Sequence, residues 1–145
     1  LPVITAKNVF KRQVASKAQF TSVLTLAFLL LTTLAFATSG LSAWCIVPAL
    51  NGSANSEDTG VKETTGSSAY LYSATVGGGY EVDCRQRDLS NNVSGAWTRD
   101  ISSVNNAAYL EGVSRMFAGH EVCLQFSNNL TTPVRVEVNG SWDSN

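Results

Sequence analysis

Apolar and polar residues follow two different patterns along this chain. The stretch 20–37 contains no charged residue, Gly or Pro, and its apolar residues would surround a helix on every side. From residue 69 onward, apolar and polar residues alternate with a period of two in several short runs, which indicates β-strands with one buried side. The pattern therefore predicts one apolar helix followed by a small β domain.

The alternation is clearest at 122–126 and at 134–138, and further strands are expected at 69–76, 80–85, 96–101 and 107–117. Three consecutive glycines at 77–79 predict a hairpin between the first two of these strands. Asn139-Gly140 predicts a tight turn close to the end of the chain. Strands of this length separated by frequent turns predict a small antiparallel β-sandwich or open barrel, and the whole fold is expected to be mainly β.

The apolar segment is long enough to cross a membrane. Extended to residue 43 it has 24 residues, which as a helix measure roughly 36 Å, more than the roughly 30 Å hydrocarbon core of a bilayer. Residues 1–19 contain four basic residues and no acidic one. The remaining 126 residues contain six basic and eleven acidic residues. The positive-inside rule therefore places residues 1–19 in the cytoplasm and the β domain outside.

Four regions are predicted from this pattern. They are a basic cytoplasmic segment at 1–19, a transmembrane helix or uncleaved signal anchor at 20–43, a Gly-, Ser-, Thr- and Asn-rich linker at 44–68, and an extracytoplasmic β domain at 69–145. A cleaved secretory signal peptide is the alternative, because Ala35-Phe36-Ala37 has the small-x-small pattern of a cleavage site. The protein is then secreted.

Three cysteines stand in the outer part of the chain. Cys84 and Cys123 fall in predicted strands, and a disulfide between them would stabilise the domain by about 3–4 kcal/mol in the chain-entropy model. Cys123 alternates onto the side opposite Val122 and Leu124, so the bridge would lie on the outer side or at an edge. For Cys45 a free buried thiol, a bond to another chain, and a bond to one of the other two cysteines all remain open.

No catalytic, cofactor-binding or metal-binding motif stands out in this sequence. The single histidine, His120, has no nucleophile motif near it, and the cysteines lack the spacing of a zinc site. Glu81 and Asp83 are expected on one solvated strand face, balanced by Arg85 and Arg87. We therefore expect a protein that is not an enzyme and uses no cofactor. With a formal net charge of −1 it is not expected to bind nucleic acid.

Aromatic residues and glycosylation signals add detail to the β domain. Trp97 and Tyr109 are expected to fill the core, whereas Trp142 is expected to be exposed or docked on the sheet. Possible N-glycosylation sites in predicted loops are Asn51, Asn92, Asn129 and Asn139.

An apolar helix that carries a β-rich head resembles the architecture of type IV pilin-like subunits. The resemblance is one of shape, because Gln19 and Leu24 stand where pilins have Gly and Glu. It implies a structural subunit of a surface assembly, a pilin-like filament or a membrane complex, whose helix contacts membrane lipid and other copies or envelope proteins. The alternative is a secreted or tethered binding module for a glycan or a protein.

Overall fold

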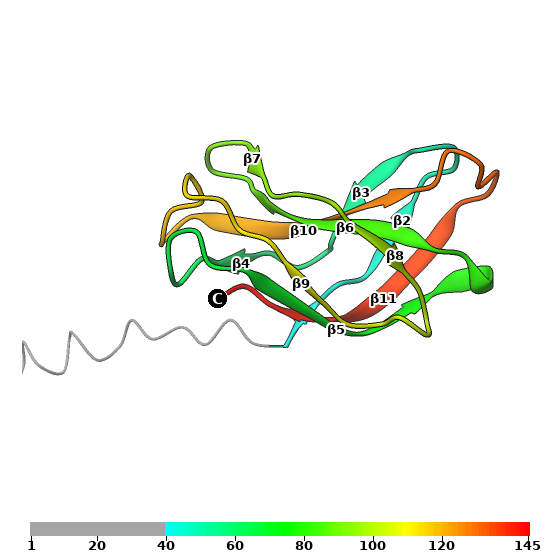
Figure 1. Ribbon diagram of the computed structural model, residues 1–145, viewed down its shortest axis with the longest axis horizontal. Coiled ribbons are helices and arrows are strands. Elements are labelled where there is room, and N and C mark those ends of the chain that lie inside the picture. The colour runs from blue at the N-terminus through cyan, green and yellow to red at the C-terminus, as the bar shows by residue number, and fades with distance from the viewer. Residues whose placement is uncertain (1–39) are drawn as a thin grey trace, which may run out of the picture. The chain divides into compact units, whose positions relative to one another are not determined.

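The alternation of apolar and polar residues produces two antiparallel sheets that share one core (Figure 1). The computed structural model describes residues 40–145, so the predicted segment 1–19 and positions 20–39 of the predicted membrane helix lie outside the described residues. Within residues 40–145, no helix combines the length and the apolar character needed to cross a membrane. Neither sheet closes into a barrel over this range. The described part is therefore mainly β and sandwich-like.

The five-stranded sheet has the order β1-β11-β5-β9, with β2 also paired to β11. Its strands are β1 (Leu41–Ser42), β2 (Cys45–Val47), β5 (Ala69–Val76), β9 (Ala108–Leu110) and β11 (Val136–Asp143).

The six-stranded sheet has the order β3-β10-β6-β7, with β4 paired to β10 and β8 paired to β6. Its strands are β3 (Ser53–Asn55), β4 (Gly60–Val61), β6 (Val82–Asp88), β7 (Val93–Ser94), β8 (Thr98–Ile101) and β10 (Glu121–Asn128). In Figure 1 the strands β5 and β11 form the lower layer, and β6 and β10 lie in the upper one.

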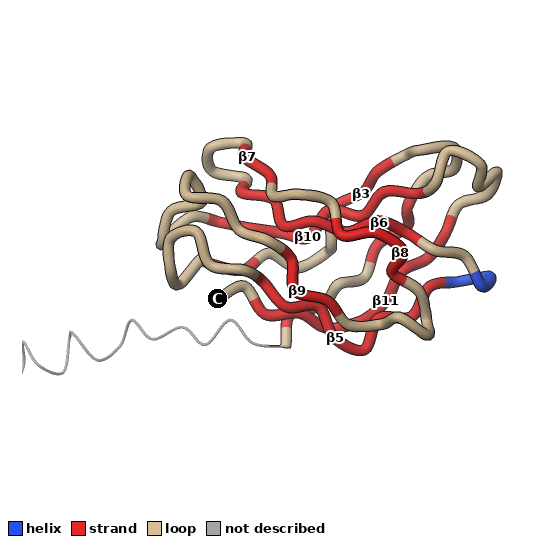
Figure 2. Tube along the Cα trace, in the orientation of Figure 1, coloured by secondary structure: helices blue, strands red, loops and turns tan. Residues whose placement is uncertain are grey.

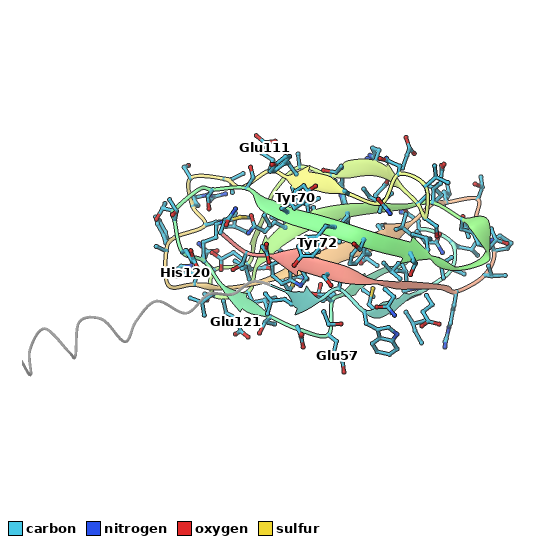
Figure 3. The ribbon with its side chains drawn as sticks, turned by 90° about the horizontal axis from the view of Figure 1, so that it is seen from below. Glu57, Tyr70, Tyr72, Glu111, His120 and Glu121 are labelled. Atoms are coloured by element: carbon cyan, nitrogen blue, oxygen red, sulfur yellow. The ribbon has the colours of Figure 1, made fainter. Side chains whose placement is uncertain are left out.

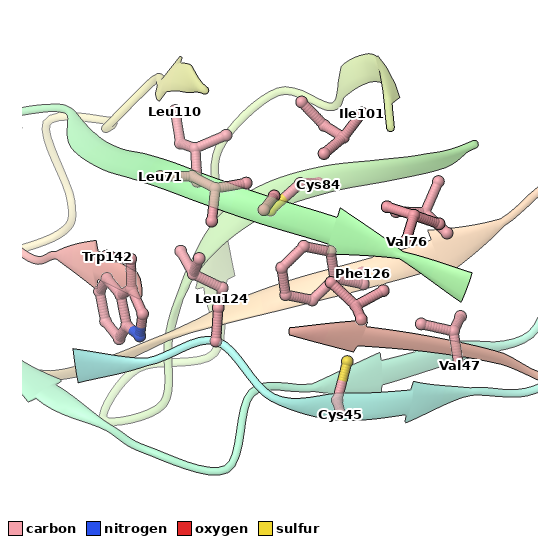
Figure 4. Packing of buried hydrophobic residues seen from close by; sticks show 14 of the residues in the cluster. Cys45, Val47, Leu71, Val76, Cys84, Ile101, Leu110, Leu124, Phe126 and Trp142 are labelled. Atoms are coloured by element: carbon pink, nitrogen blue, oxygen red, sulfur yellow. The ribbon is translucent and has the colours of Figure 1, made fainter. Parts of the chain in front are cut away.

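The core lies between the two sheets and is built from the inward side of the long strands (Figure 4). Val122, Leu124 and Phe126 of β10 are fully buried there, which confirms the strand predicted from their alternation. The strand predicted at 69–76 is also confirmed, because β5 has the same bounds. Leu71 and Trp142 of the five-stranded sheet lie opposite the buried side chains of β10.

The hairpin predicted around the glycines is wrong, although the turn itself exists. Gly77–Gly79 forms a short 3-10 turn, η2, which connects β5 in one sheet to β6 in the other (Figure 2). Gly78 has φ = 67°, a conformation that glycine adopts without strain. The two strands do not pair, because each finds its hydrogen-bond partners elsewhere: β5 pairs with β11 and β9, and β6 with β10.

The turn predicted at Asn139-Gly140 is also wrong. These residues lie inside β11, where the pairing with β5 shifts register between Asn139 and Ser141. A Cβ at Gly140 would stand 3.0 Å from the Cα of Ala74, so glycine lets the backbones of β11 and β5 approach closely here. The strand therefore continues, and it carries Trp142 into the core with no exposed surface rather than leaving it at the surface as predicted.

The predicted linker is part of the sandwich. Residues 44–68 contain β2, β3 and β4, and Lys62 within them has only 1% exposure. Leu41–Ser42 form β1 on β11, so these two residues of the predicted helix are in a strand. Polar composition suggested a tether, but short strands with polar outer sides give the same composition.

The disulfide predicted between Cys84 and Cys123 is not formed, and Cys45, Cys84 and Cys123 are all free buried thiols. Cys84 pairs in register with Phe126 and lies in the core, whereas Cys123 pairs with Arg87 and lies on the outer side of the same sheet. Because their side chains leave opposite sides of adjacent strands, a bridge would require a rotated strand. Cys45 is buried in the core cluster, and its bond to another chain stays a prediction.

Candidate functional site

The outer side of the five-stranded sheet carries three tyrosines and two carboxylates, which we call the tyrosine face: Tyr70, Tyr72, Tyr109, Glu137 and Asp143. Tyr70 stands at the centre, because its cross-strand partners are Tyr109 on β9 and Asp143 on β11. Tyr72 follows two residues later on the same strand, so strand alternation places it on the same side. Figure 3 looks onto this face and shows Tyr70 and Tyr72 together along β5.

The three rings form one continuous strip. The ring centroids of Tyr70 and Tyr109 are 4.6 Å apart with a tilt of 45°, and those of Tyr70 and Tyr72 are 5.9 Å apart with a tilt of 24°. Tyr109 is 75% exposed although the sequence predicted it in the core. The strip therefore presents aromatic surface to solvent, with the hydroxyl groups as polar tips.

Carboxylates give this face a negative character. Asp143 Oδ1 accepts the Gly40 N–H at 2.7 Å and the Tyr72 hydroxyl at 3.3 Å. Desolvation, and then the charge of Asp143, raise the pKa of Tyr72, so its hydroxyl stays protonated. Glu137 accepts the indole N–H of Trp44 at 3.1 Å. Because the five strands of this sheet contain no Lys, Arg or His, the face suits a cation or a hydrogen-bond donor.

The outer side of the six-stranded sheet has the opposite character. We call it the arginine face and define it by Arg85 and Arg87 on β6, Arg99 on β8, Trp97 just before β8, and Gln125 on β10. It holds three of the five arginines of residues 40–145. Arg85 and Gln125 are cross-strand partners, so these side chains lie next to each other.

Two of these arginines form no ion pair within residues 40–145. The Arg85 guanidinium lies 4.2 Å above the Trp97 ring centroid and donates from Nε to Gln125 at 2.8 Å. Arg87 donates to Asn92 at 2.9 Å. Among residues 40–145 neither Arg85 nor Arg87 forms an ion pair, and burial and the neighbouring Arg87 charge lower the pKa of Arg85. Each guanidinium therefore keeps donors for an external acceptor.

The expected balance of charges on β6 is only partly right. Asp83 forms an ion pair with Arg99 and leaves Arg85 and Arg87 without a carboxylate. Trp97, predicted in the core, is half-buried and lies against Arg85 on the outer side. An indole under a guanidinium is a cation–π contact, which no period-two pattern signals.

Two buried polar clusters lie away from these faces. His120 Nδ1 is 2.8 Å from Asp88 Oδ2, and the other oxygen of Asp88 accepts the backbone N–H groups of Ser90 and Asn91. Within residues 40–145, no serine, threonine or cysteine side chain is hydrogen-bonded to the His120 ring, so the pair orders a loop. In the same range, no group of three His, Cys, Asp or Glu could hold a metal ion.

Lys62 is the second buried polar group. Its Nζ donates to the carbonyl of Ser67, to the carbonyl of Ser144 at 3.0 Å and to Gln86 Oε1 at 3.4 Å. Desolvation lowers its pKa from 10.5 to about 8. The three acceptors connect the loop after β4 with β6 and the end of the chain, so this lysine ties both sheets together.

The remaining predicted residues lie on the surface or inside the domain without forming a site. Asn51 and Asn92 are exposed in turns, Asn129 is half-buried in a loop, and Asn139 is exposed on β11 beside the tyrosine face. Their glycosylation stays a prediction. Burial raises the pKa of Cys45 to about 12 and of Cys123 to about 11, and it raises that of Cys84 well above its usual range.

Comparison with known proteins gives no family. No protein-family model matches the chain, and neither the curated proteins nor the solved structures contain a significant match. The geometry of the two faces is therefore the basis for a function.

Proposed function

We propose that this chain is a non-enzymatic structural subunit of a cell-envelope assembly. Its sandwich is held outside the membrane by the predicted N-terminal apolar segment and associates through its outer faces. The single observation that carries this proposal is the separation of chemistry between those faces: aromatic rings and carboxylates on one, unpaired guanidinium groups on the other. Exposed aromatic and arginine side chains are the residue types enriched at protein interfaces.

The extracytoplasmic location is supported by the charge pattern and is compatible with three free cysteines. Oxidation requires the thiolate, and burial raises the pKa of all three thiols, so each stays protonated near neutral pH. The basic residues before the apolar segment favour export of the sandwich.

A glycan-binding module is the second candidate, and the tyrosine strip is the observation that favours it. Flat aromatic rings can contact the C–H faces of a pyranose, while Asp143 and Ser141 beside them supply acceptors and a donor for its hydroxyls. Without a basic residue in the strands of this face, the sugar would be neutral. This candidate requires only the tyrosine face, whereas the assembly proposal gives both faces a role.

Location and association can be tested on the same full-length chain carrying a C-terminal epitope tag. Protease added outside spheroplasts should remove the tag while a cytoplasmic marker stays intact. After extraction in mild detergent, sedimentation velocity should show a particle of several subunits. A protected tag, or a monomer that binds neutral polysaccharide, would contradict the assembly proposal, and the second result would establish the glycan-binding module instead.

A further inference from the structure

We propose that the arginine face of one copy receives the tyrosine face of a second copy, so that the chains stack head to tail. This inference rests on the proposed function and names the partner of both faces. Arg85 and Arg87 would insert between the rings of the tyrosine face and its carboxylates.

The tyrosine face is built to attract a guanidinium group. A cation is stabilised over the face of an aromatic ring, and a planar guanidinium also pairs with a carboxylate through two parallel hydrogen bonds. Tyr70 has an aromatic neighbour on one side, Tyr109, and a carboxylate neighbour on the other, Asp143. Both kinds of partner are thus present side by side around one residue.

The arginine face offers such groups already held in place. Arg85 is fixed by the Trp97 ring and by Gln125, and Arg87 by Asn92, so little side-chain entropy is lost on docking. Arg99 serves as an internal contrast, because Asp83 already neutralises it. The contact therefore depends on Arg85 and Arg87.

The two faces belong to different sheets and lie on the outer sides of the sandwich, so they cannot meet within one molecule. A contact between two different surfaces of the same chain repeats, and it produces a row or a ring rather than a closed two-fold dimer.

Edge-to-edge pairing of strands is a poor competitor. The strands at the sheet edges, β1, β2, β3, β4, β7, β8 and β9, are each two to four residues long. Edges this short offer few unpaired backbone groups to a neighbour. The broad outer faces of the long strands are then the larger surfaces available for association.

Charge complementarity identifies the partner as a second copy. Residues 40–145 contain six basic and eleven acidic residues, so the domain carries a net charge of 6 − 11 = −5. Two copies therefore repel each other in most orientations. They attract when the arginine face of one copy meets the tyrosine face of the other. The same chain thus carries both halves of a directional contact.

The test is a charge exchange in the full-length chain, followed by sedimentation velocity in detergent. The acidic-face variant carries Arg85→Glu and Arg87→Glu, and the basic-face variant carries Glu137→Arg and Asp143→Arg. Each variant alone brings like charges together and should weaken self-association at least tenfold. Mixed at equal concentration, they should restore the wild-type particle, because each altered face meets a complementary one. Restoration also shows that both variants are folded.

A control changes charge elsewhere on the domain. Arg115→Glu alters an exposed arginine that lies in a turn outside the strands, and it should leave the particle unchanged. The inference is overturned if the variants keep the wild-type particle size, or if the mixture stays dissociated. A particle that persists in every variant overturns only the face-to-face contact, whereas a wild-type monomer overturns the proposed function as well.

Discussion

The two outer faces of the sandwich are covered in different ways. On the arginine face, three residues of β10 that point outward, Cys123, Gln125 and Ser127, are still buried to 1%, 8% and 8% exposure. Arg85 lies against Gln125 and over the Trp97 ring, since long side chains can lie flat over a sheet. The tyrosine face has no such cover, and Tyr109 stays 75% exposed. One face thus presents charged groups that its own side chains already hold in place, and the other presents an aromatic ring that projects into solvent.

The largest difference expected from this contrast is between the two tryptophans, Trp142 and Trp97. Trp142→Ala should lower the free energy of unfolding by about 3–5 kcal/mol, because it empties a fully buried site between the sheets. Trp97→Ala removes only part of the cover on the arginine face and should cost about 1–2 kcal/mol. Urea denaturation of both variants checks this order. Equal losses would show that the cover of the arginine face is part of the core.

Lys62 provides a buried cation to compare with the surface arginines. Its pKa in the folded state, about 8, lies below the value of 10.5 that it has when unfolded. The unfolded state therefore binds more protons between these values, and the contribution of Lys62 to stability rises with pH by up to about 3 kcal/mol. The three buried thiols act oppositely above pH 9, because their pKa values are raised on folding.

The measurement is therefore the difference in unfolding free energy between wild type and Lys62→Met, from pH 7.5 to pH 10.5. The thiol contributions cancel in this difference, which should move in favour of wild type as the pH rises. A flat difference would mean that Lys62 is solvated in the folded state.

Cysteine labelling compares the cover of the arginine face with the core on a finer scale. Cys123 is covered only by surface side chains, so it should react with a thiol reagent through local motion, at a rate that low urea concentrations barely change. Cys84 lies in the core and should react only through unfolding, at a rate that rises with urea. The denatured, unreduced protein should show three free thiols. A single free thiol would instead indicate that a disulfide forms in the protein, as the sequence predicted.

The smallest effect on stability is expected on the tyrosine face. Tyr109→Ser removes a ring that is mostly in solvent, so the unfolding free energy should fall by only about 0.5 kcal/mol. Self-association should nevertheless weaken, because the same ring is part of the proposed contact. If the variant associates as strongly as wild type, Tyr109 is not part of that contact.

The sequence predicted the strands better than it predicted their partners. Alternation placed Val122, Leu124 and Phe126 inside correctly, because the side of a strand depends on local spacing. Pairing depends on the whole chain, and this is why the predicted strands 69–76 and 80–85 were wrongly joined in a hairpin. The Asn139-Gly140 dipeptide serves a bulge instead of a turn, since Gly140 must fit against β5.

The candidate faces were harder to predict than the fold. Tyr70 and Tyr72 alternate with buried Ala69 and Leu71, so the sequence already contained the signal that both tyrosines share an outer side. Tyr109 joins them only because β9 pairs with β5 in that register, which no local pattern reveals. Arg85 was placed on the correct side, but its partners Trp97 and Gln125 come from other strands or the segments beside them.

Head-to-tail contact between the two faces is tested most directly by a photo-crosslinker on the open face. With p-benzoylphenylalanine placed at position 109 of the full-length chain, irradiation should produce a crosslinked dimer. Mass spectrometry of its peptides should join position 109 of one copy to the segment 83–99 of another. Crosslinks to 69–76 of a second copy would indicate tyrosine faces packed on each other, and an uncrosslinked monomer would indicate no contact. Either of those results would contradict head-to-tail contact between the arginine face and the tyrosine face.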